Sequence, residues 1–254
     1  MAHTVGEVSK YLEELLEIGK YSSFDASLNG LQVGDAARPV SRIAYAVDAC
    51  QEAARRAHEA GADLLVVHHG LFWGDPVPLV GPRYRMLSLL VESSLSLFAA
   101  HLPLDAHPEV GNNARLAALL GLSETRPFGW YRGVPLGVWG TLEHPVSVHD
   151  LLGRFPGVNE AVTLLPFGPE EIRTVGVVSG SASSVVEEAV SLGLDAFITG
   201  EVHHSAYYPA QEGGVTVAGI GHYRSETVGP LALKERVERD LGIEGFFIDL
   251  PTGL

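Results

Sequence analysis

The chain has 254 residues, of which 46% are hydrophobic, and it carries a formal net charge of -14 with only 17 Lys and Arg. This length supports one large domain or two small ones with a hydrophobic core. The acidity disfavours binding to nucleic acids or anionic membranes, because a protein surface that binds them must neutralise phosphates. The single cysteine excludes an internal disulfide, and neither an apolar leader nor a run of ~18 apolar residues is present, so we expect a cytoplasmic protein that does not enter a membrane.

The first half of the chain alternates predicted helices and strands. Thr4 with Glu7 three residues later forms a capping box, which opens an amphipathic helix through Ile18. Phe24 to Gly34 is predicted to be irregular. The following pattern predicts strands at Ile43–Val47, Asp63–Val67 and Leu95–Ala100, and helices at Gln51–Ala60, Arg83–Ser93 and Asn112–Leu120. Near-continuous apolar strands between helices indicate a mainly parallel sheet covered on both faces.

The pattern restarts in the second half, after a segment rich in Pro, Gly and Trp. That segment predicts strands at Val134–Leu142 and Ala161–Leu165, around a short helix after Ser147. Beyond it we predict strands at Arg173–Val178, Asp195–Thr199 and Val215–Ile220, and helices at Ser181–Leu192 and Thr227–Leu241. We therefore expect an α/β fold of two similar lobes with mainly parallel sheets, packed as one body: residues 1–123, a connecting segment 124–170, and residues 171–254.

Imidazoles and carboxylates follow three of the predicted strands. His68 and His69 end one strand, whereas His101 with Asp105 and His222 with Glu226 repeat one four-residue spacing after two others. Because ligands of open α/β sheets gather at the carboxyl ends of strands, these groups predict a metal site between the lobes. Residues four apart are neighbours on a helical turn, although Pro103 favours a loop for the first pair.

The donor set indicates which metals would bind. Two carboxylates and several imidazoles exceed the needs of one tetrahedral ion, so we expect paired ions roughly 3.5–4 Å apart. Imidazole with carboxylate suits Zn, Mn, Fe or Co. A single His after a strand is more often a hydrogen-bonded structural residue, but the repeated spacing favours ligands. The remaining histidines before position 150 lack this support and are interpreted as surface, capping or loop residues: His3, His58, His107, His144 and His149.

Glu201, His203 and His204 follow another predicted strand end. They are candidates for a further metal, substrate or acid–base group. The alternative is that they cap the next helix, and the sequence leaves both interpretations open.

Several linked motifs resemble the Nif-three-like dinuclear-metal family, whose members are often described as type 2 GTP cyclohydrolase I. The resemblance spans nearly the whole chain. It lies in five motifs: Leu28-Asn-Gly-Leu-Gln-Val-Gly34, Val67-His-His-Gly-Leu-Phe-Trp73, His101-Leu-Pro-Leu-Asp105 through Ala117, Thr199-Gly-Glu-Val-His-His204 and Gly221-His-Tyr-Arg-Ser-Glu226. The third motif departs from the family pattern, because it reads Leu-Pro where Thr-Asn is more usual.

The resemblance implies a ligand set and an assembly. It assigns two divalent ions per subunit to His68, His69, Asp105, His222 and Glu226, with Glu226 as a bridge. It places His101 beside the metals as a proton carrier or supporting group, and it implies a homohexamer whose sites face an internal cavity.

Two functions are compatible with this resemblance. The first is a metal-dependent hydrolase acting on a small molecule, which opens the purine ring of GTP or cleaves a phosphoester, with His101 or the His203–His204 pair carrying protons. The second is a non-catalytic protein that stores or delivers metal or serves as an adaptor.

Overall fold

The computed structural model of the chain describes residues 3–156, 158 and 163–254. The chain forms two compact units. The first comprises residues 1–104 and 230–250, and the second comprises residues 105–229 and 251–254. The predicted lobe boundaries (1–123, 124–170 and 171–254) are drawn from the repeated sequence pattern, whereas the two units are defined by spatial contacts. The lobe boundaries therefore stay a prediction.

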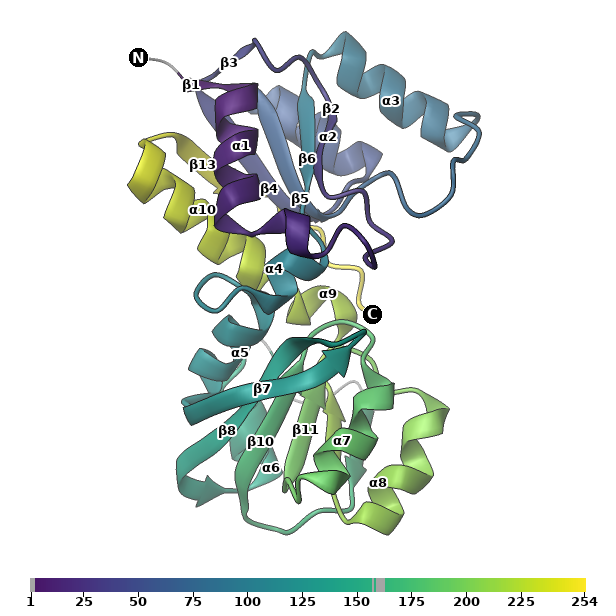
Figure 1. Cartoon of the computed structure of the whole chain (residues 1–254), viewed down its shortest axis with the longest axis vertical. Coiled ribbons are helices and arrows are strands. Elements are labelled where there is room, and N and C mark those ends of the chain that lie inside the picture. The colour runs from purple at the N-terminus through teal and green to yellow at the C-terminus, as the bar shows by residue number, and fades with distance from the viewer. Residues whose placement is uncertain (1–2, 157, 159–162) are drawn as a thin grey trace. The chain divides into compact units, whose positions relative to one another are not determined.

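The first unit is built on a five-stranded sheet with three parallel pairings. Its strands run in the order β13 (Glu244–Phe247), β4 (Arg42–Asp48), β5 (Leu64–His69), β6 (Ser96–Ala99) and β2 (Gly30–Val33), and β2 is antiparallel to its neighbour. The buried strands alternate their side chains between two apolar layers. Helices α2 (Gln51–Glu59) and α3 (Pro82–Glu92) cover one face, whereas α1 (Val5–Leu15) and α10 (Val228–Leu241) cover the other (Figure 1).

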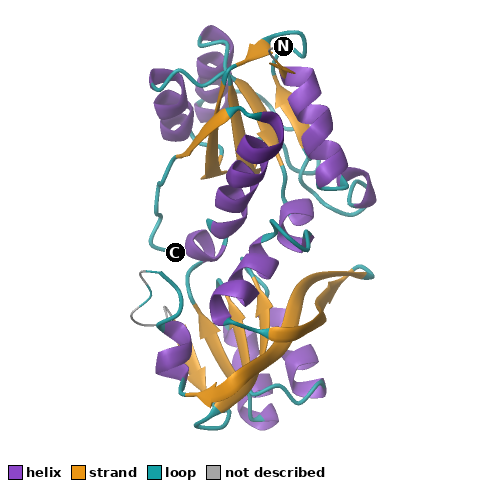
Figure 2. Cartoon of the chain, turned by 90° about the vertical axis from the view of Figure 1, so that its left-hand side faces the viewer, coloured by secondary structure: helices purple, strands orange, loops and turns teal. Residues whose placement is uncertain are grey.

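The second unit has a mixed six-stranded sheet with a parallel centre. The order is β7 (Ser123–Tyr131), β8 (Val134–Val146), β10 (Ile172–Val178), β11 (Ala196–Thr199), β12 (Thr216–Gly219) and β9 (Thr163–Pro166), with β10, β11 and β12 parallel. Helices α7 (Val186–Ser191) and α8 (Tyr207–Gly213) pack on one face. Helices α5 (Asn112–Leu120) and α6 (Val148–Leu152) pack on the other, as the layers in Figure 2 show.

Short elements connect these layers. They are β1 (His3–Thr4), β3 (Pro39–Val40), η1 (Ile18–Lys20), α4 (Leu102–Ala106), η2 (Ser183–Val185), η3 (His204–Ala206) and α9 (His222–Ser225). None of the helices in the described ranges combines the length and apolarity that a bilayer span needs.

The predicted two-lobe α/β fold is confirmed, but some segments differ from expectation. The segment 24–34 is not wholly irregular, because Gly30–Val33 pairs with β6 as an edge strand. Strands β7 and β13 were not predicted. Strand β7 contains Pro127, which an edge strand tolerates since one side of its backbone is unpaired. Of the predicted strand at 161–165, the first two residues lie outside the described residues.

Proline does not prevent a helix after His101. Residues Leu102–Ala106 form α4, so the predicted loop is wrong at this point. Pro103 lies in the first turn, where the backbone N–H has no partner within the helix, and its missing donor therefore costs nothing there.

Candidate metal centre

Three histidines gather at the carboxyl ends of β5 and β6 in the first unit. His68 and His69 are the last two residues of β5, and His101 follows β6. One potential ligand atom from each lies within 4.8 Å of those of the other two. The ring centroids are 4.6 Å apart for His68 and His69, and 5.2 Å apart for His68 and His101. Parallel pairing of β5 and β6 therefore brings together imidazoles that lie far apart in the sequence.

Each of these imidazoles is held through its Nδ1 atom. His68 Nδ1 lies 2.9 Å from the carbonyl oxygen of Ala100, His69 Nδ1 2.9 Å from Asp48 Oδ1, and His101 Nδ1 2.9 Å from Asp25 Oδ1. A carbonyl or carboxylate oxygen only accepts, so Nδ1 must carry the hydrogen and donate it. In the neutral ring Nε2 then keeps its lone pair, which is the arrangement that metal-ligating histidines show.

Asp25 is the most heavily bonded of these acceptors. Its side chain is 1% exposed. It accepts hydrogen bonds from the amides of Ser27 and Leu102, from the Asn29 side chain and from His101. Burial raises the pKa of the Asp25 carboxyl, but the bonds and charge of His101 and the bonds from Asn29 and Ser27 outweigh burial and leave the pKa below its usual value. Asp25 therefore stays ionised and fixes the His101 ring.

In the second unit, His222 and Glu226 form a close pair. His222 Nε2 lies 3.2 Å from Glu226 Oε2, and His222 Nδ1 lies 2.5 Å from Glu201 Oε1. The Glu226 side chain is 3% exposed. The hydrogen bond with Glu226 raises the pKa of His222 to about 9, against the lowering effect of burial, and Glu201 raises it further in the same direction. Without a metal, His222 is therefore an imidazolium at neutral pH.

Asp105 lies beside the turn that follows β10. Its Oδ1 accepts from Asn112 Nδ2 at 2.9 Å and from Ser179 Oγ at 2.8 Å. The next residue, Gly180, has φ +65°, and a Cβ built on it would lie 2.5 Å from Glu226 Oε1. Consecutive residues of one turn therefore contact Asp105 on one side and Glu226 on the other, so the two carboxylates share the carboxyl end of β10.

Comparison with known proteins identifies the family. The family model described as Duf34/NIF3 (NGG1p interacting factor 3) matches residues 3–252. The chain belongs to the Duf34/NIF3 family. This confirms the resemblance read from the sequence motifs.

Relatives of this Duf34/NIF3 protein match it over nearly their whole length. A "GTP cyclohydrolase 1 type 2 homolog" of Archaeoglobus fulgidus is 44% identical over 98% of this chain and 99% of its own length. The same name is given to a Treponema pallidum protein, 41% identical over 99% of this chain and 100% of its own. The crystal structure of the protein TTHA1606 from Thermus thermophilus is 40% identical, covers 99% of this chain and 100% of its own, and superposes with a TM-score of 0.86.

His203 and His204 differ in their connections. His203 Nε2 lies 3.0 Å from Ser181 Oγ and 3.1 Å from Glu201 Oε2. Glu201 thus contacts both His203 and His222, and hydrogen bonding to His203 is the largest effect that lowers the pKa of Glu201. His204 is exposed at the start of η3. In this member of the Duf34/NIF3 family, His203 is therefore linked to a candidate ligand, whereas no such bond among the described residues places His204.

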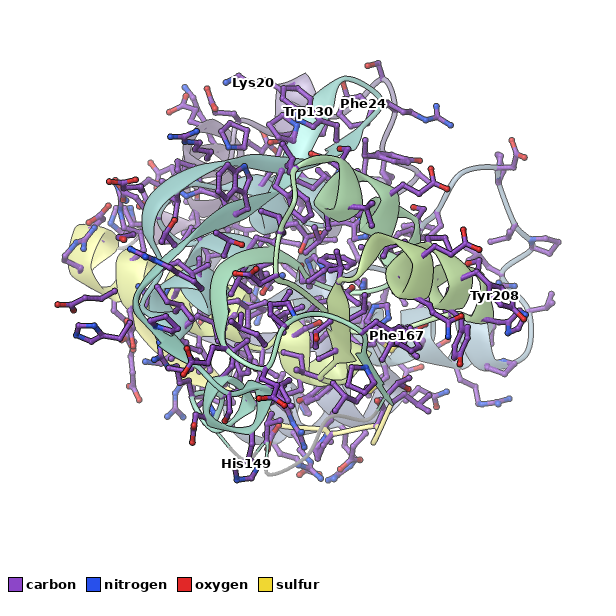
Figure 3. The ribbon with its side chains drawn as sticks, turned by 90° about the horizontal axis from the view of Figure 1, so that it is seen from below. Lys20, Phe24, Trp130, His149, Phe167 and Tyr208 are labelled. Carbon is purple, nitrogen blue, oxygen red and sulfur yellow. The ribbon has the colours of Figure 1, made fainter. Side chains whose placement is uncertain are left out.

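Four of the five remaining histidines lie at the surface or in a turn, whereas His3 is half-buried in β1 opposite Val40. His107 Nδ1 accepts the amides of Glu109 and Val110, which closes the loop before α5. His149 projects from the surface (Figure 3). His58 and His144 are also exposed.

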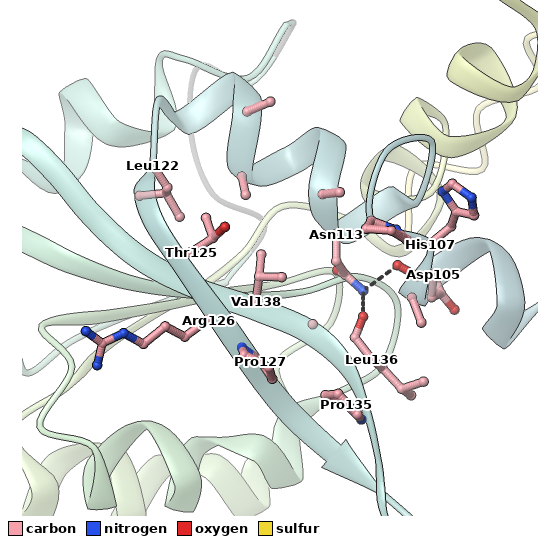
Figure 4. A pocket seen from close by; sticks show the side chains of 16 residues that line it. Asp105, His107, Asn113, Leu122, Thr125, Arg126, Pro127, Pro135, Leu136 and Val138 are labelled. Carbon is pink, nitrogen blue, oxygen red and sulfur yellow. Dashed lines mark hydrogen bonds between the residues drawn. The ribbon is translucent and has the colours of Figure 1, made fainter. Parts of the chain in front are cut away.

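A groove of about 420 Å³ lies between α5 and the β7–β8 ribbon (Figure 4). Small and apolar side chains such as Ala117, Pro127 and Val138 line it, and Asp105 lies at one end. At that end the Asn113 side chain donates to the carbonyl oxygens of Asp105 and Leu136, as the dashed lines show. These bonds hold the segment that carries Asp105 rather than offering donors to a ligand.

The sequence did not reveal the groups that orient the imidazoles. Asp25 and Asp48 precede their histidines by 76 and 21 residues. The local signal for Asp25 is its short turn, in which Oδ1 accepts the amide of Ser27. Asp48 lies opposite His69 in the register of β4 and β5, which a single sequence does not specify.

Proposed function

We propose that this protein is a divalent-metal-dependent hydrolase. Its proposed ligands are His68, His69, Asp105, His222 and Glu226, and His101 and His203 act as proton-carrying groups. His204 is proposed for the same role with weaker support, because no hydrogen bond within the described part of the chain ties it to the other groups.

One observation carries the metal assignment. All four imidazoles that flank the proposed site are bound at Nδ1 by an oxygen acceptor: His68 by Ala100, His69 by Asp48, His101 by Asp25 and His222 by Glu201. In the neutral rings of His68, His69 and His101 this bond leaves the Nε2 lone pair for a metal, which supports ligation. In His222 a metal would have to replace the proton that Nε2 shares with Glu226.

The donor chemistry fits Zn, Mn, Fe or Co rather than Mg or Ca, because imidazole nitrogens supply most of the ligands. Five ligands that include two carboxylates support two ions. Bound ions of this kind would supply Lewis-acid polarisation and lower the pKa of a water. The chain's own part is to orient the rings through Asp25, Asp48 and Glu201, and to carry protons through His101 and His203.

The substrate class rests on the relatives. Several are named GTP cyclohydrolase 1 type 2 homolog, which supports a nucleotide substrate opened at its purine ring. Phosphoester cleavage is the second reaction that the same ions support. A cytoplasmic location is proposed from the single cysteine, and a homohexamer is proposed from the family resemblance.

Metal content and turnover test this proposal together. Wild-type protein loaded separately with Zn, Mn, Fe and Co should retain about two ions per chain after desalting, as measured by elemental analysis. It should also convert GTP or a model phosphoester, as followed by chromatography. His68→Ala should lose metal and turnover, whereas the exposed matched control His149→Ala should keep both.

The opposite results would be equally informative. Fewer than one ion per chain in the wild type would refute the ligand set. Two ions with no turnover, rapid loss to a chelator and transfer to a partner protein would support metal delivery instead of hydrolysis.

A further inference from the structure

Trp73 is fixed in the loop that follows β5. Its indole Nε1–H donates to the carbonyl oxygen of Gly70 at 2.8 Å. The backbone of Trp73 forms an antiparallel bridge with Ser27. The amide of Leu28 donates to the Phe72 carbonyl at 3.0 Å on the same pair of segments. Trp73 is thus held through both its backbone and its indole nitrogen.

The indole lies against the histidine cluster. Its ring centroid is 4.9 Å from that of His101, with an interplanar angle of 71°, and 5.8 Å from that of His69. Both contacts are within the range of favourable aromatic pairing. Trp73 therefore borders the imidazoles that we propose as ligand and proton carrier.

Trp73 nevertheless remains open to solvent, because 37% of its surface is exposed. Large apolar surface that stays exposed beside a cluster of polar ligands is unfavourable in the free protein, and it becomes favourable when a ligand covers it. The exposed part of the Trp73 indole is therefore suited to receive an apolar face.

The chemistry of the Trp73 side chain restricts that ligand. Because the indole N–H already donates to Gly70, Trp73 offers a π face rather than a hydrogen bond. Every nucleobase or similar planar heteroaromatic ring has a π face, and stacking of such a ring on an aromatic side chain is a common source of affinity. A flat, unsaturated ring is the ligand that such a π face favours.

We propose that Trp73 is the stacking platform for a planar heteroaromatic ring of the substrate, which it holds beside His69 and His101. This inference rests on the proposed function and names the substrate class of that site. The platform would position the ring for the proposed proton carrier His101 without taking part in the chemistry.

Equilibrium binding of defined probes tests the platform. The probes are guanosine, GTP and inorganic triphosphate, titrated calorimetrically into zinc-loaded and EDTA-treated protein. Trp73→Leu keeps an apolar side chain but removes the π face. It should weaken guanosine and GTP binding by roughly tenfold and leave triphosphate binding and metal content unchanged. Trp73→Phe should lie between Trp73→Leu and the wild type.

A second exposed tryptophan supplies the matched control. Trp130 on β7, labelled in Figure 3, is 56% exposed, and Trp130→Leu should leave all affinities unchanged. Unchanged guanosine affinity in Trp73→Leu would overturn the inference. Loss of metal along with guanosine binding would also overturn it, because Trp73 would then only support the histidines. A metal-free wild type would refute the proposed function alone, since the guanosine comparison can still be made in EDTA-treated protein.

Discussion

At the scale of single residues, the proposed metal site depends on hydrogen-bond acceptors as much as on the proposed ligands. Asp25, Asp48 and Glu201 each bind the Nδ1 atom of one imidazole. Asp25 and Asp48 therefore decide which nitrogen of the neutral ring carries the hydrogen, whereas Glu201 fixes the orientation of the His222 ring. Removing one of them would leave the ligand or proton carrier present in the chain but wrongly oriented.

Asp25 is expected to matter for stability as well as for orientation. Asp25→Ala removes a buried acceptor of four hydrogen bonds whose donors are buried or half-buried. Because unsatisfied buried donors keep their desolvation cost, we expect a loss of about 2–4 kcal/mol in the free energy of unfolding, measured by urea denaturation. The matched control is Asp35→Ala, which removes an exposed aspartate that accepts the amide of Ala37 in a similar turn. It should cost less than about 0.5 kcal/mol, and equal losses would contradict this role of Asp25.

The raised pKa of His222 predicts a pH dependence of metal binding. With a pKa of about 9 in the metal-free protein, His222 must release a proton before it can ligate. Apparent zinc affinity should therefore rise roughly tenfold per pH unit from about pH 7 towards about pH 9 and level off above it.

The folding stability of the metal-free protein should change with pH in the opposite direction. The protonated form contributes stability below the unfolded pKa of about 6.5, and this contribution is lost as the pH rises through about 9.

A substitution can assign this titration to His222. Glu201→Gln removes one of the two carboxylate charges that lie beside the His222 ring, so the pKa of His222 should fall below that of the wild type. It should stay above its ordinary value, because Glu226 contributes more to the raised pKa than Glu201 does. Imidazole NMR titration of EDTA-treated protein measures it. Glu187→Gln changes an exposed acid on α7 and should shift nothing. A wild-type midpoint near the ordinary histidine value of about 6.5 would contradict the assignment.

At the scale of secondary-structure elements, the turns that follow the parallel strands position the donors. The turn after β10 places Ser179 on Asp105 and Gly180 against Glu226. The turn after β11 supplies Glu201, and α9 after β12 supplies His222. Glycine is required at Gly180 for two separate reasons, its positive φ and the space that Glu226 occupies.

These two reasons can be separated by experiment. Gly193 has the same φ of +65° as Gly180, but none of the described atoms lies within 4 Å of a Cβ built on it. Gly193→Ala should therefore show only the backbone penalty of about 1 kcal/mol and keep its metal. Gly180→Ala should incur the same penalty, displace the Glu226 carboxylate and lose metal. Thermal denaturation and elemental analysis measure the two effects, and equal metal content in both variants would contradict the role of Gly180.

At the scale of the whole molecule, each unit contributes part of the proposed ligand set. The first unit supplies His68 and His69, and the second supplies Asp105, His222 and Glu226. A metal that binds only the native chain stabilises it by mass action, by about 4 kcal/mol at a free concentration roughly a thousandfold above Kd. Metal binding should therefore be visible in the thermal stability of the entire chain.

Chelation should lower the melting temperature of the zinc-loaded protein by several degrees. The same EDTA treatment should leave the melting temperature of His68→Ala almost unchanged, since that variant has little metal to lose. His149→Ala should respond as the wild type does. An equal effect of EDTA on wild type and His68→Ala, measured by calorimetry, would argue against metal bound through His68.

The sequence by itself determined the two-lobe α/β fold, the family and the candidate donors. Apolar runs and glycine stops are local signals, and the four-residue spacing of His101 with Asp105 and of His222 with Glu226 is local as well. The edge strands β2, β7 and β13 escaped prediction because an edge strand is only partly buried and has a weak apolar pattern. Pro103 misled the prediction for α4, because its cost depends on its position within the helix.

Only the tertiary structure decided how the imidazoles are held. Asp48 reaches His69 because the parallel register of β4 and β5 places the two residues opposite each other. Asp25 reaches His101 because the chain folds back across 76 residues. The exposed indole of Trp73 beside these rings depends on the same folding. Hydrogen bonds of this kind act over about 3 Å, and residue order does not specify such distances until the strands are paired.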